Sequence, residues 1–90
     1  MLKTVSIIVT GKVQGVFYRH STKEKATELG ITGEVKNRPD DSVAIIATGS
    51  SEKIDSFVEW CKQGPPKAKV ANIFLANLPF QSFEKFNIVR

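Results

Sequence analysis

The sequence is poor in cysteine and has no long apolar run. A single cysteine, Cys61, cannot form an internal disulfide, and it makes a cysteine-based metal site improbable. No apolar stretch approaches the roughly 18 residues that a membrane-spanning helix needs. The N-terminal segment lacks the small-residue cleavage site of a secretory signal peptide. These absences argue against a disulfide-stabilised secreted domain and a membrane-spanning protein, and they predict a cytoplasmic protein without a membrane partner.

Acidic residues are outnumbered by basic ones. The 90 residues carry a net charge of +4, which favours anionic partners such as nucleic acid, an acidic membrane surface or a small phosphorylated substrate. The lysines are scattered, and the longest cluster, "KAK" at 67–69, is short, as is typical of a solvated surface. The apolar segments "TVSIIVT" and "SVAIIAT" contain no aromatic residue on which a base could stack. Nucleic-acid binding is therefore disfavoured.

Hydrophobic periodicity divides the chain into strands and helices that fit a single domain, residues 1–90. One helix is marked by apolar residues at helical spacing and by a glycine and two prolines at its end. Its apolar face comprises Ile54, Phe57, Val58 and Cys61, and Ser50 or Ser51 is its predicted cap. The other predicted helix is 18–29, and the predicted strands are 3–10, 31–38, 42–48, 68–76 and a short final one at 85–90.

This order, β-α-β-β-α-β with a short extra strand, predicts an α+β fold. It is the plan of a ferredoxin-like α/β sandwich, with an antiparallel sheet and both helices on one face. The right-handed crossover rule places strand 42–48 between strands 3–10 and 31–38. The last two then run parallel, and their C-terminal ends lie at the same edge of the sheet, two strand spacings or about 10 Å apart.

The segment "GKVQGVFYRH", residues 11–20, leads from the first strand into the first helix. Gly11 and Gly15 give the backbone freedom to turn N–H groups toward an anion at the helix N-terminus. Arg19 falls in the first helical turn, where its guanidinium can bind phosphate oxygens in bidentate fashion. Asn37 ends the second strand at the same edge and can hold a water in line with the anion. The segment matches neither a P-loop nor the dinucleotide-binding glycine motif, so an ordinary glycine turn is the alternative.

Other reactive side chains are better explained without catalysis. His20 is expected to face another side of the helix than the arginine before it. Asp40 and Asp41, in "PDD", predict a turn rather than a pair of catalytic carboxylates. Ser21 and Glu24 fit a capping box, which would start the helix later and loosen the placement of the arginine.

Longer motifs resemble one protein family. "GKVQGVFYR" followed by "LGITGEVKN" resembles the acylphosphatase signature: G-x-V-Q-G-V, an aromatic residue before arginine, then L-G-x-x-G and V-[RK]-N. "GPPKAKV" at 64–70 and "FNIVR" at 86–90 continue the resemblance in the family's order, so it covers nearly the whole chain. The resemblance implies the ferredoxin-like fold and hydrolysis of the carboxyl–phosphate bond of acyl phosphates, without a metal or another cofactor.

The resemblance also implies roles for individual residues. Arg19 would bind the phosphate and stabilise the transition state, and Asn37 would orient the attacking water. Inorganic phosphate or another anion is then expected to bind as product or inhibitor, and we expect a monomer. The loop amides that would cradle the phosphoryl group belong to Lys12, Val13, Gln14, Gly15 and Val16.

Some positions depart from the family pattern. The family often has tryptophan or another large apolar residue where Glu34 stands. It often has glycine where Asp41 stands, which predicts a different turn in the hairpin after Asn37. A small polar residue is frequent at Arg38, so these departures bear on substrate preference.

Other functions remain compatible with the same domain. A regulatory anion sensor would use the same cradle without turnover, and fold alone does not distinguish the two. The carbamoyltransferases of hydrogenase maturation carry a similar domain, but 90 residues are too few for the rest of that enzyme.

Overall fold

The computed structural model describes residues 1–89, so the last position of the predicted strand 85–90 lies outside the described residues. Every predicted strand and helix is present, with bounds within two residues of the prediction. No helix in the described range is long and apolar enough to cross a membrane. The elements are β1 (Leu2–Lys12), α1 (Tyr18–Glu28), β2 (Thr32–Asn37), β3 (Val43–Ser50), α2 (Ser51–Gln63), β4 (Lys69–Leu78) and β5 (Phe86–Val89).

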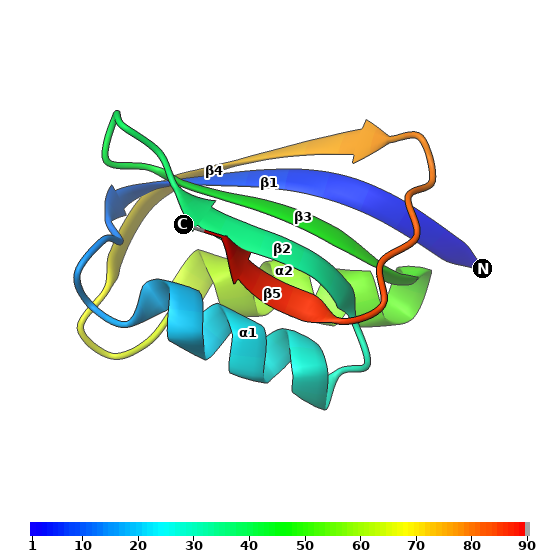
Figure 1. The fold of residues 1–90 in the computed structure, drawn as a ribbon. Helices are drawn as coiled ribbons and strands as arrows, with labels where there is room; N and C mark the ends of the chain where they lie inside the picture. Colours follow the sequence, from blue (N-terminus) through cyan, green and yellow to red (C-terminus); the bar gives the residue numbers. More distant parts are fainter. Residues whose placement is uncertain (90) are drawn as a thin grey trace.

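The strands form one sheet in the order β4-β1-β3-β2-β5, and both helices cover the same face of it (Figure 1). Strand β3 is antiparallel to both β1 and β2. This confirms the predicted central place of β3 and the ferredoxin-like sandwich. Because β1 and β2 therefore run in the same direction, their C-terminal ends meet at one edge of the sheet.

The sheet is mixed, because β5 runs parallel to β2. The prediction of a purely antiparallel sheet is wrong at this edge. The cause is the connection 79–85, which stays at the end of the sheet where β4 ends and β2 begins (Figure 1). The Gln81 amide donates to Thr4 Oγ1 at 2.9 Å, and Thr48 Oγ1 donates to the Gln81 carbonyl at 2.8 Å. These bonds hold the connection across the sheet end, so β5 starts beside the start of β2.

The hydrophobic core lies between the sheet and the helices. Side chains alternate along a strand, so every second residue of β1 points toward the helices. These residues are Val5, Ile7 and Val9, each at most 1% exposed. The predicted apolar face of α2 is confirmed, because Ile54, Phe57, Val58 and Cys61 are all buried. Full burial of one such side chain contributes about 1.5–3 kcal/mol, and this packing fixes the strand ends that carry the site.

Helix α1 begins at Tyr18, as predicted, without a side-chain cap. The residue before it, Phe17, has φ 63° and ψ 22°, which is the left-handed conformation. The capping box of Ser21 and Glu24 does not form; instead the Ser21 amide donates to the Phe17 carbonyl at 2.9 Å, as in a helix that has already begun. Arg19 therefore lies in the first turn, where N–H groups have no intrahelical partner.

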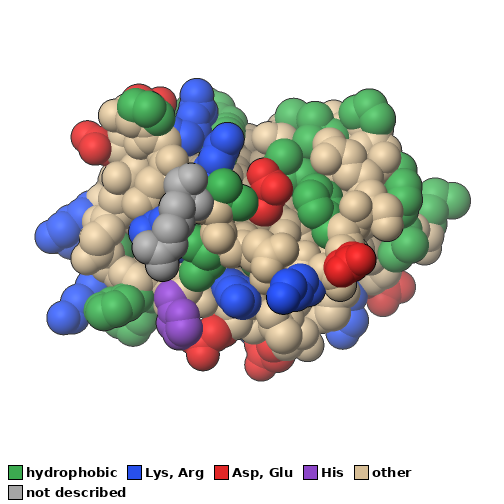
Figure 2. Space-filling model, viewed as in Figure 1, with side chains coloured by type: hydrophobic (Ala, Val, Ile, Leu, Met, Phe, Trp, Pro, Cys, Tyr) green, Lys and Arg blue, Asp and Glu red, His purple; other side chains and the backbone are tan. Residues whose placement is uncertain are grey.

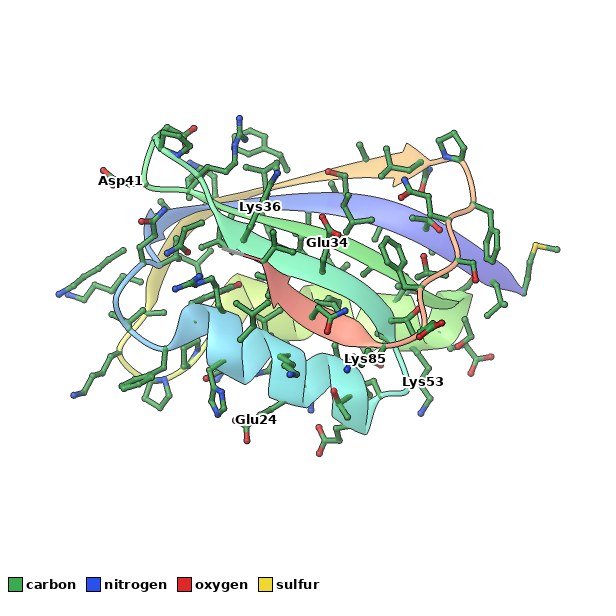
Figure 3. The ribbon with its side chains drawn as sticks, in the orientation of Figure 1. Glu24, Glu34, Lys36, Asp41, Lys53 and Lys85 are labelled. Carbon is green, nitrogen blue, oxygen red and sulfur yellow. The ribbon has the colours of Figure 1, made fainter. Side chains whose placement is uncertain are left out.

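The connection between β2 and β3 turns at Asp40 and Asp41, which confirms the turn prediction. Asp40 Oδ1 accepts hydrogen bonds from the Ser42 hydroxyl at 2.5 Å and the Ser42 amide at 3.0 Å, and these bonds lower the pKa of Asp40. Asp41 lies at the hairpin tip (Figure 3) with φ 73°, in the left-handed region that favours glycine. Asp41 thus adopts a backbone conformation that favours glycine.

Candidate active site

Buried apolar side chains fix the loop between β1 and α1. Val13 is fully buried and Val16 is 8% exposed, whereas Gly15 between them is exposed and has φ 74°. Glycine suits this conformation because it has no Cβ to clash with the backbone. Within residues 1–89, no backbone carbonyl accepts a hydrogen bond from the amides of residues 14–17. The valines therefore anchor the loop from inside and leave its N–H groups for a bound anion.

Gln14 ties this loop to the β2–β3 hairpin. Its Nε2 donates to the carbonyl oxygen of Arg38 at 2.9 Å and to that of Ser42 at 2.8 Å. The Ser42 carbonyl also accepts from the Arg38 amide at 2.8 Å, so the three residues form one network. The Gln14 side chain is committed to the hairpin, and only its backbone amide is left for an anion.

Replacement of Gln14 by alanine should weaken the fold and the loop together. The change removes two hydrogen bonds of about 0.5–1.5 kcal/mol each, so the melting temperature should fall by about 5–10 °C. Thermal denaturation measures this, and calorimetry should show severalfold weaker phosphate binding. Gln63→Ala, at the exposed end of α2, is the matched control. If Gln14→Ala melted at the same temperature as Gln63→Ala, the Gln14 hydrogen bonds would not stabilise the fold, and this prediction would be contradicted.

A cavity of about 280 Å³ lies beside the loop. Arg19 reaches it from the first turn of α1, and Asn37 from the C-terminal end of β2. The predicted meeting of these two residues at one edge of the sheet is confirmed. The residues that line the cavity are Val13, Gly15, Phe17, Tyr18, Arg19, His20, Asn37 and Ile88.

Other predicted site residues lie outside this lining. Lys12 and Gln14 line a neighbouring cavity together with Asp41. Val16 lines an apolar groove that is described below. The Gln14 side chain is bonded to the hairpin and the Val16 side chain is buried, so these two residues can offer an anion only their N–H groups.

The departures from the family pattern also lie outside the lining of the 280 Å³ cavity, since neither Glu34 nor Arg38 nor Asp41 contributes to it. Figure 3 shows Glu34 and Lys36 on the face of β2 that the helices do not cover. The charge of Glu34 therefore faces away from the cavity and the core.

His20 lines the cavity beside Arg19, so the expectation that it faces elsewhere is wrong. The cavity lies at the N-terminal end of α1, and the first three residues of the helix, Tyr18, Arg19 and His20, all line it. His20 lies at the surface (Figure 2, purple), and its Nε2 is 3.6 Å from Glu24 Oε1. Among the described residues 1–89, Arg19 is the only arginine or lysine in the lining.

The nearby phenol and thiol are directed into the core. The Tyr18 hydroxyl donates to the Cys61 carbonyl at 2.8 Å, and burial raises the pKa of this phenol. Burial also raises the pKa of the Cys61 thiol to about 12. Both groups are neutral at physiological pH. Among residues 1–89, those that line the cavity include no carboxylate and no thiol, so hydrogen-bond donors dominate the described part of this site.

Asn37 has an unsatisfied side chain. Its Oδ1 is buried and has no hydrogen-bond partner within residues 1–89. A buried unpaired carbonyl costs about 1–3 kcal/mol, so this amide does not serve the stability of the fold. Because Asn37 lines the cavity while its oxygen is buried, we infer that the Nδ2 amino group is its polar end toward the cavity. It can donate a hydrogen bond to a water beside an anion held by Arg19.

Known proteins share the sequence as well as the fold. The acylphosphatase family model matches residues 5–88. The chain belongs to the acylphosphatase family. An acylphosphatase from Methylococcus capsulatus is 41% identical over 90 residues, which are 99% of this chain and 98% of that protein.

Solved acylphosphatase structures agree over the whole fold. The acylphosphatase from Coxiella burnetii has a TM-score of 0.95 at 36% identity and covers 98% of this chain and 93% of its own. The acylphosphatase from Bacillus subtilis has a TM-score of 0.89 at 40% identity and covers 100% of both chains. Both the resemblance and the ferredoxin-like fold predicted from the sequence are confirmed, and the protein is an enzyme of the hydrolase class.

Sequence reasoning missed Phe17, Tyr18 and Ile88 as lining residues. The first two lie inside the "VFYR" segment of the acylphosphatase signature, so their proximity to the site could have been inferred. Ile88 offered no such signal, because it reaches the cavity through the parallel pairing of β5 with β2.

Proposed function

We propose that this protein hydrolyses the carboxyl–phosphate bond of small acyl phosphates, releasing a carboxylate and inorganic phosphate. The observation that carries this proposal is the convergence of Arg19 and Asn37 on one cavity beside a loop of unpaired backbone amides. The guanidinium and the amides supply the donors for a phosphoryl group, and the asparagine supplies a donor for water.

The phosphoryl group is held by charge and by oriented N–H groups. The amides of the β1–α1 loop and of the first turn of α1 donate to its oxygens, and the helix dipole favours the negative charge. Arg19 donates two parallel hydrogen bonds to two of the oxygens. In a loose transition state the charge spreads over three equatorial oxygens. Donors fixed at those positions stabilise the transition state more than the ground state.

Asn37 positions the attacking water. Its Nδ2 donates to one lone pair of the water oxygen, and the other lone pair attacks phosphorus. The bond between phosphorus and the carboxyl oxygen breaks, and its electron pair leaves with the carboxylate. A proton of the water passes to a phosphoryl oxygen. We assign this acceptor because, among residues 1–89, the cavity lining includes no carboxylate, and the His20 imidazole lies against Glu24.

The weak basicity of the leaving group explains why few catalytic side chains suffice for hydrolysis. A carboxylate leaves without protonation, since the pKa of its parent acid is near 4. Neither a general acid nor a covalent nucleophile is then required, in keeping with a Tyr18 hydroxyl and a Cys61 thiol that are both directed into the core. In a phosphate monoester of an aliphatic alcohol the leaving group is an alkoxide, and its departure usually needs an acid, a nucleophile or metal ions. We expect such monoesters to be poor substrates.

We further assign this activity to a single-domain monomer in the cytoplasm, with inorganic phosphate as a product inhibitor. One sheet and one core support a single domain, and the lone buried thiol of Cys61 suits a reducing compartment. Lys and Arg side chains lie around the end that carries the β1–α1 loop, whereas hydrophobic side chains gather at the opposite end (Figure 2). This distribution favours the approach of small anions.

Hydrolysis of acetyl phosphate by the purified protein tests the proposed function. We expect phosphate release that persists in excess chelator. Hydrolysis of an alkyl phosphate such as glycerol phosphate, whose alkoxide leaving group needs a proton, should be slower by about 10² or more, the contribution that a missing general acid would make. Phosphate binding without turnover would contradict the proposal and favour the anion sensor. Activity that disappears with chelator and returns with added metal would contradict the proposed chemistry.

A further inference from the structure

Phe17 combines two features that do not favour the folded state. Its φ of 63° places it in the left-handed region, which is strained for a bulky side chain. Its side chain is 76% exposed, so the ring gains little from packing. Glycine would satisfy the same backbone conformation without strain. A strained and exposed aromatic residue at the entrance of an active site points to a role in binding.

An apolar groove of about 270 Å³ adjoins this ring. Pro65 and Pro66 form its other wall, between the end of α2 and the start of β4. The remaining lining residues are Val16, Ser21 and Lys67. The volume lies just below the roughly 300–1,000 Å³ of drug-sized ligand pockets. The groove therefore suits a small chemical group rather than a segment of a macromolecule.

The groove is preformed, because its two walls are fixed to each other. Gly64 has φ 69° and lies so close to Tyr18 that an added Cβ would come within 2.8 Å of the tyrosine ring. The Tyr18 hydroxyl also donates to the Cys61 carbonyl at 2.8 Å. These contacts hold the segment before Pro65 against the start of α1. Phe17 directly precedes this helix.

The groove continues the proposed phosphate site. Within residues 1–89, only Phe17 lines both the cavity of Arg19 and the groove. The β1–α1 loop separates the two sites: Asn37 at the end of β2 lines the cavity but not the groove, whereas Pro65 and Pro66 of the α2–β4 connection line the groove but not the cavity. An in-line displacement places the leaving group opposite the attacking water. With the water on Asn37 at the end of β2, the leaving carboxylate points toward the groove.

We infer that Phe17 and the proline wall, Pro65 and Pro66, bind the acyl substituent of the substrate and make the enzyme selective for apolar, preferably aromatic, acyl phosphates. This inference rests on the proposed function and names its substrate class. An aromatic substituent stacks on the Phe17 ring and removes apolar surface of both prolines from water. A methyl substituent is too short to fill the groove. Phe17 is thus a specificity-determining residue. Its strained backbone conformation serves recognition of the acyl substituent rather than the stability of the fold.

The experiment compares benzoyl phosphate with acetyl phosphate in two variants. Phe17→Asn removes the ring but keeps a residue that tolerates the left-handed conformation, whereas Phe17→Tyr keeps the ring. In Phe17→Asn, kcat/KM for benzoyl phosphate should fall about tenfold, mainly through KM, because the contact exists in both the ground state and the transition state. The loss for acetyl phosphate should stay below about threefold. Phe17→Tyr should retain the wild-type preference for benzoyl phosphate.

Matched controls separate selectivity from damage to the fold. Phe80 is 59% exposed and lies in the connection between β4 and β5, so Phe80→Asn removes a comparable ring far from the site and should leave both substrates unaffected. Pro66→Ser alters the opposite wall and should reduce the benzoyl preference in the same direction. The inhibition constant of phosphate should not change in Pro66→Ser.

Different failures have different meanings. An equal loss for both substrates in Phe17→Asn would overturn the inference, because Phe17 would then support the phosphate cradle. Unchanged kinetics for both substrates would also overturn it, because the groove would be unused. Failure of the wild-type protein to hydrolyse acetyl phosphate would overturn the proposed function itself.

Discussion

Arg19→Ala is expected to lower kcat/KM for acyl phosphates by about 10²–10³ or more, the loss seen when a donor to a transition-state oxyanion is removed. Within residues 1–89, Arg19 is the only arginine or lysine that lines the cavity. It lies in the first turn of α1, and in the proposed mechanism its guanidinium binds the phosphoryl group together with the loop amides. Steady-state kinetics and the inhibition constant of phosphate measure both effects.

Two further variants sharpen this result. Arg19→Lys should recover only a small part of the activity, because an ammonium group cannot donate two parallel hydrogen bonds to a phosphoryl group. Lys23→Ala removes the same charge from an exposed position of the same helix and should leave the kinetics unchanged. Full activity in Arg19→Ala, or an equal loss in Lys23→Ala, would contradict the role of Arg19.

Asn37→Ala should lower kcat by about 10² or more while changing the phosphate inhibition constant little, because in the proposed mechanism the amide contacts the water rather than the phosphoryl group. The variant should not lose stability. Asn37 Oδ1 is buried without a partner within residues 1–89, and its removal relieves a cost of about 1–3 kcal/mol that offsets lost packing. Kinetics, phosphate inhibition and thermal denaturation together test this combination.

Asn87→Ala, at an exposed position of β5, is the control for removal of an amide. Asn37→Asp gives a second test, because a carboxylate beside the phosphoryl group should weaken phosphate binding as well as turnover. A parallel loss of turnover and phosphate affinity in Asn37→Ala would show that Asn37 binds the phosphoryl group. A lower melting temperature would show that its side chain is structural.

Local patterns were enough to predict the elements and the place of the site. The helical spacing of the α2 apolar face and the β-branched runs of β1 and β3 specify structure over a few residues. The crossover rule then placed β3 between β1 and β2. From this order alone Arg19 and Asn37 were expected at one edge, and both line the same cavity.

The remaining features depend on contacts that no short pattern encodes. The parallel pairing of β5 follows from the bonds of Gln81 with Thr4 and Thr48, of which Thr4 is 77 residues distant in the chain. The left-handed conformation of Phe17 occurs at a residue type that rarely adopts it. His20 borders the cavity because the cavity caps a helix end, which the spacing of residues along a helix does not reveal.

The most direct test of the account is the fate of oxygen when acetyl phosphate is hydrolysed in ¹⁸O-labelled water. Mass spectrometry of the products, with the uncatalysed reaction in parallel, identifies the atom that the water attacks. An Arg19 cradle around the phosphoryl group and a water on Asn37 predict one ¹⁸O atom in inorganic phosphate and none in acetate. Enzyme-dependent label in acetate would show attack at the carbonyl carbon and would contradict the central claim.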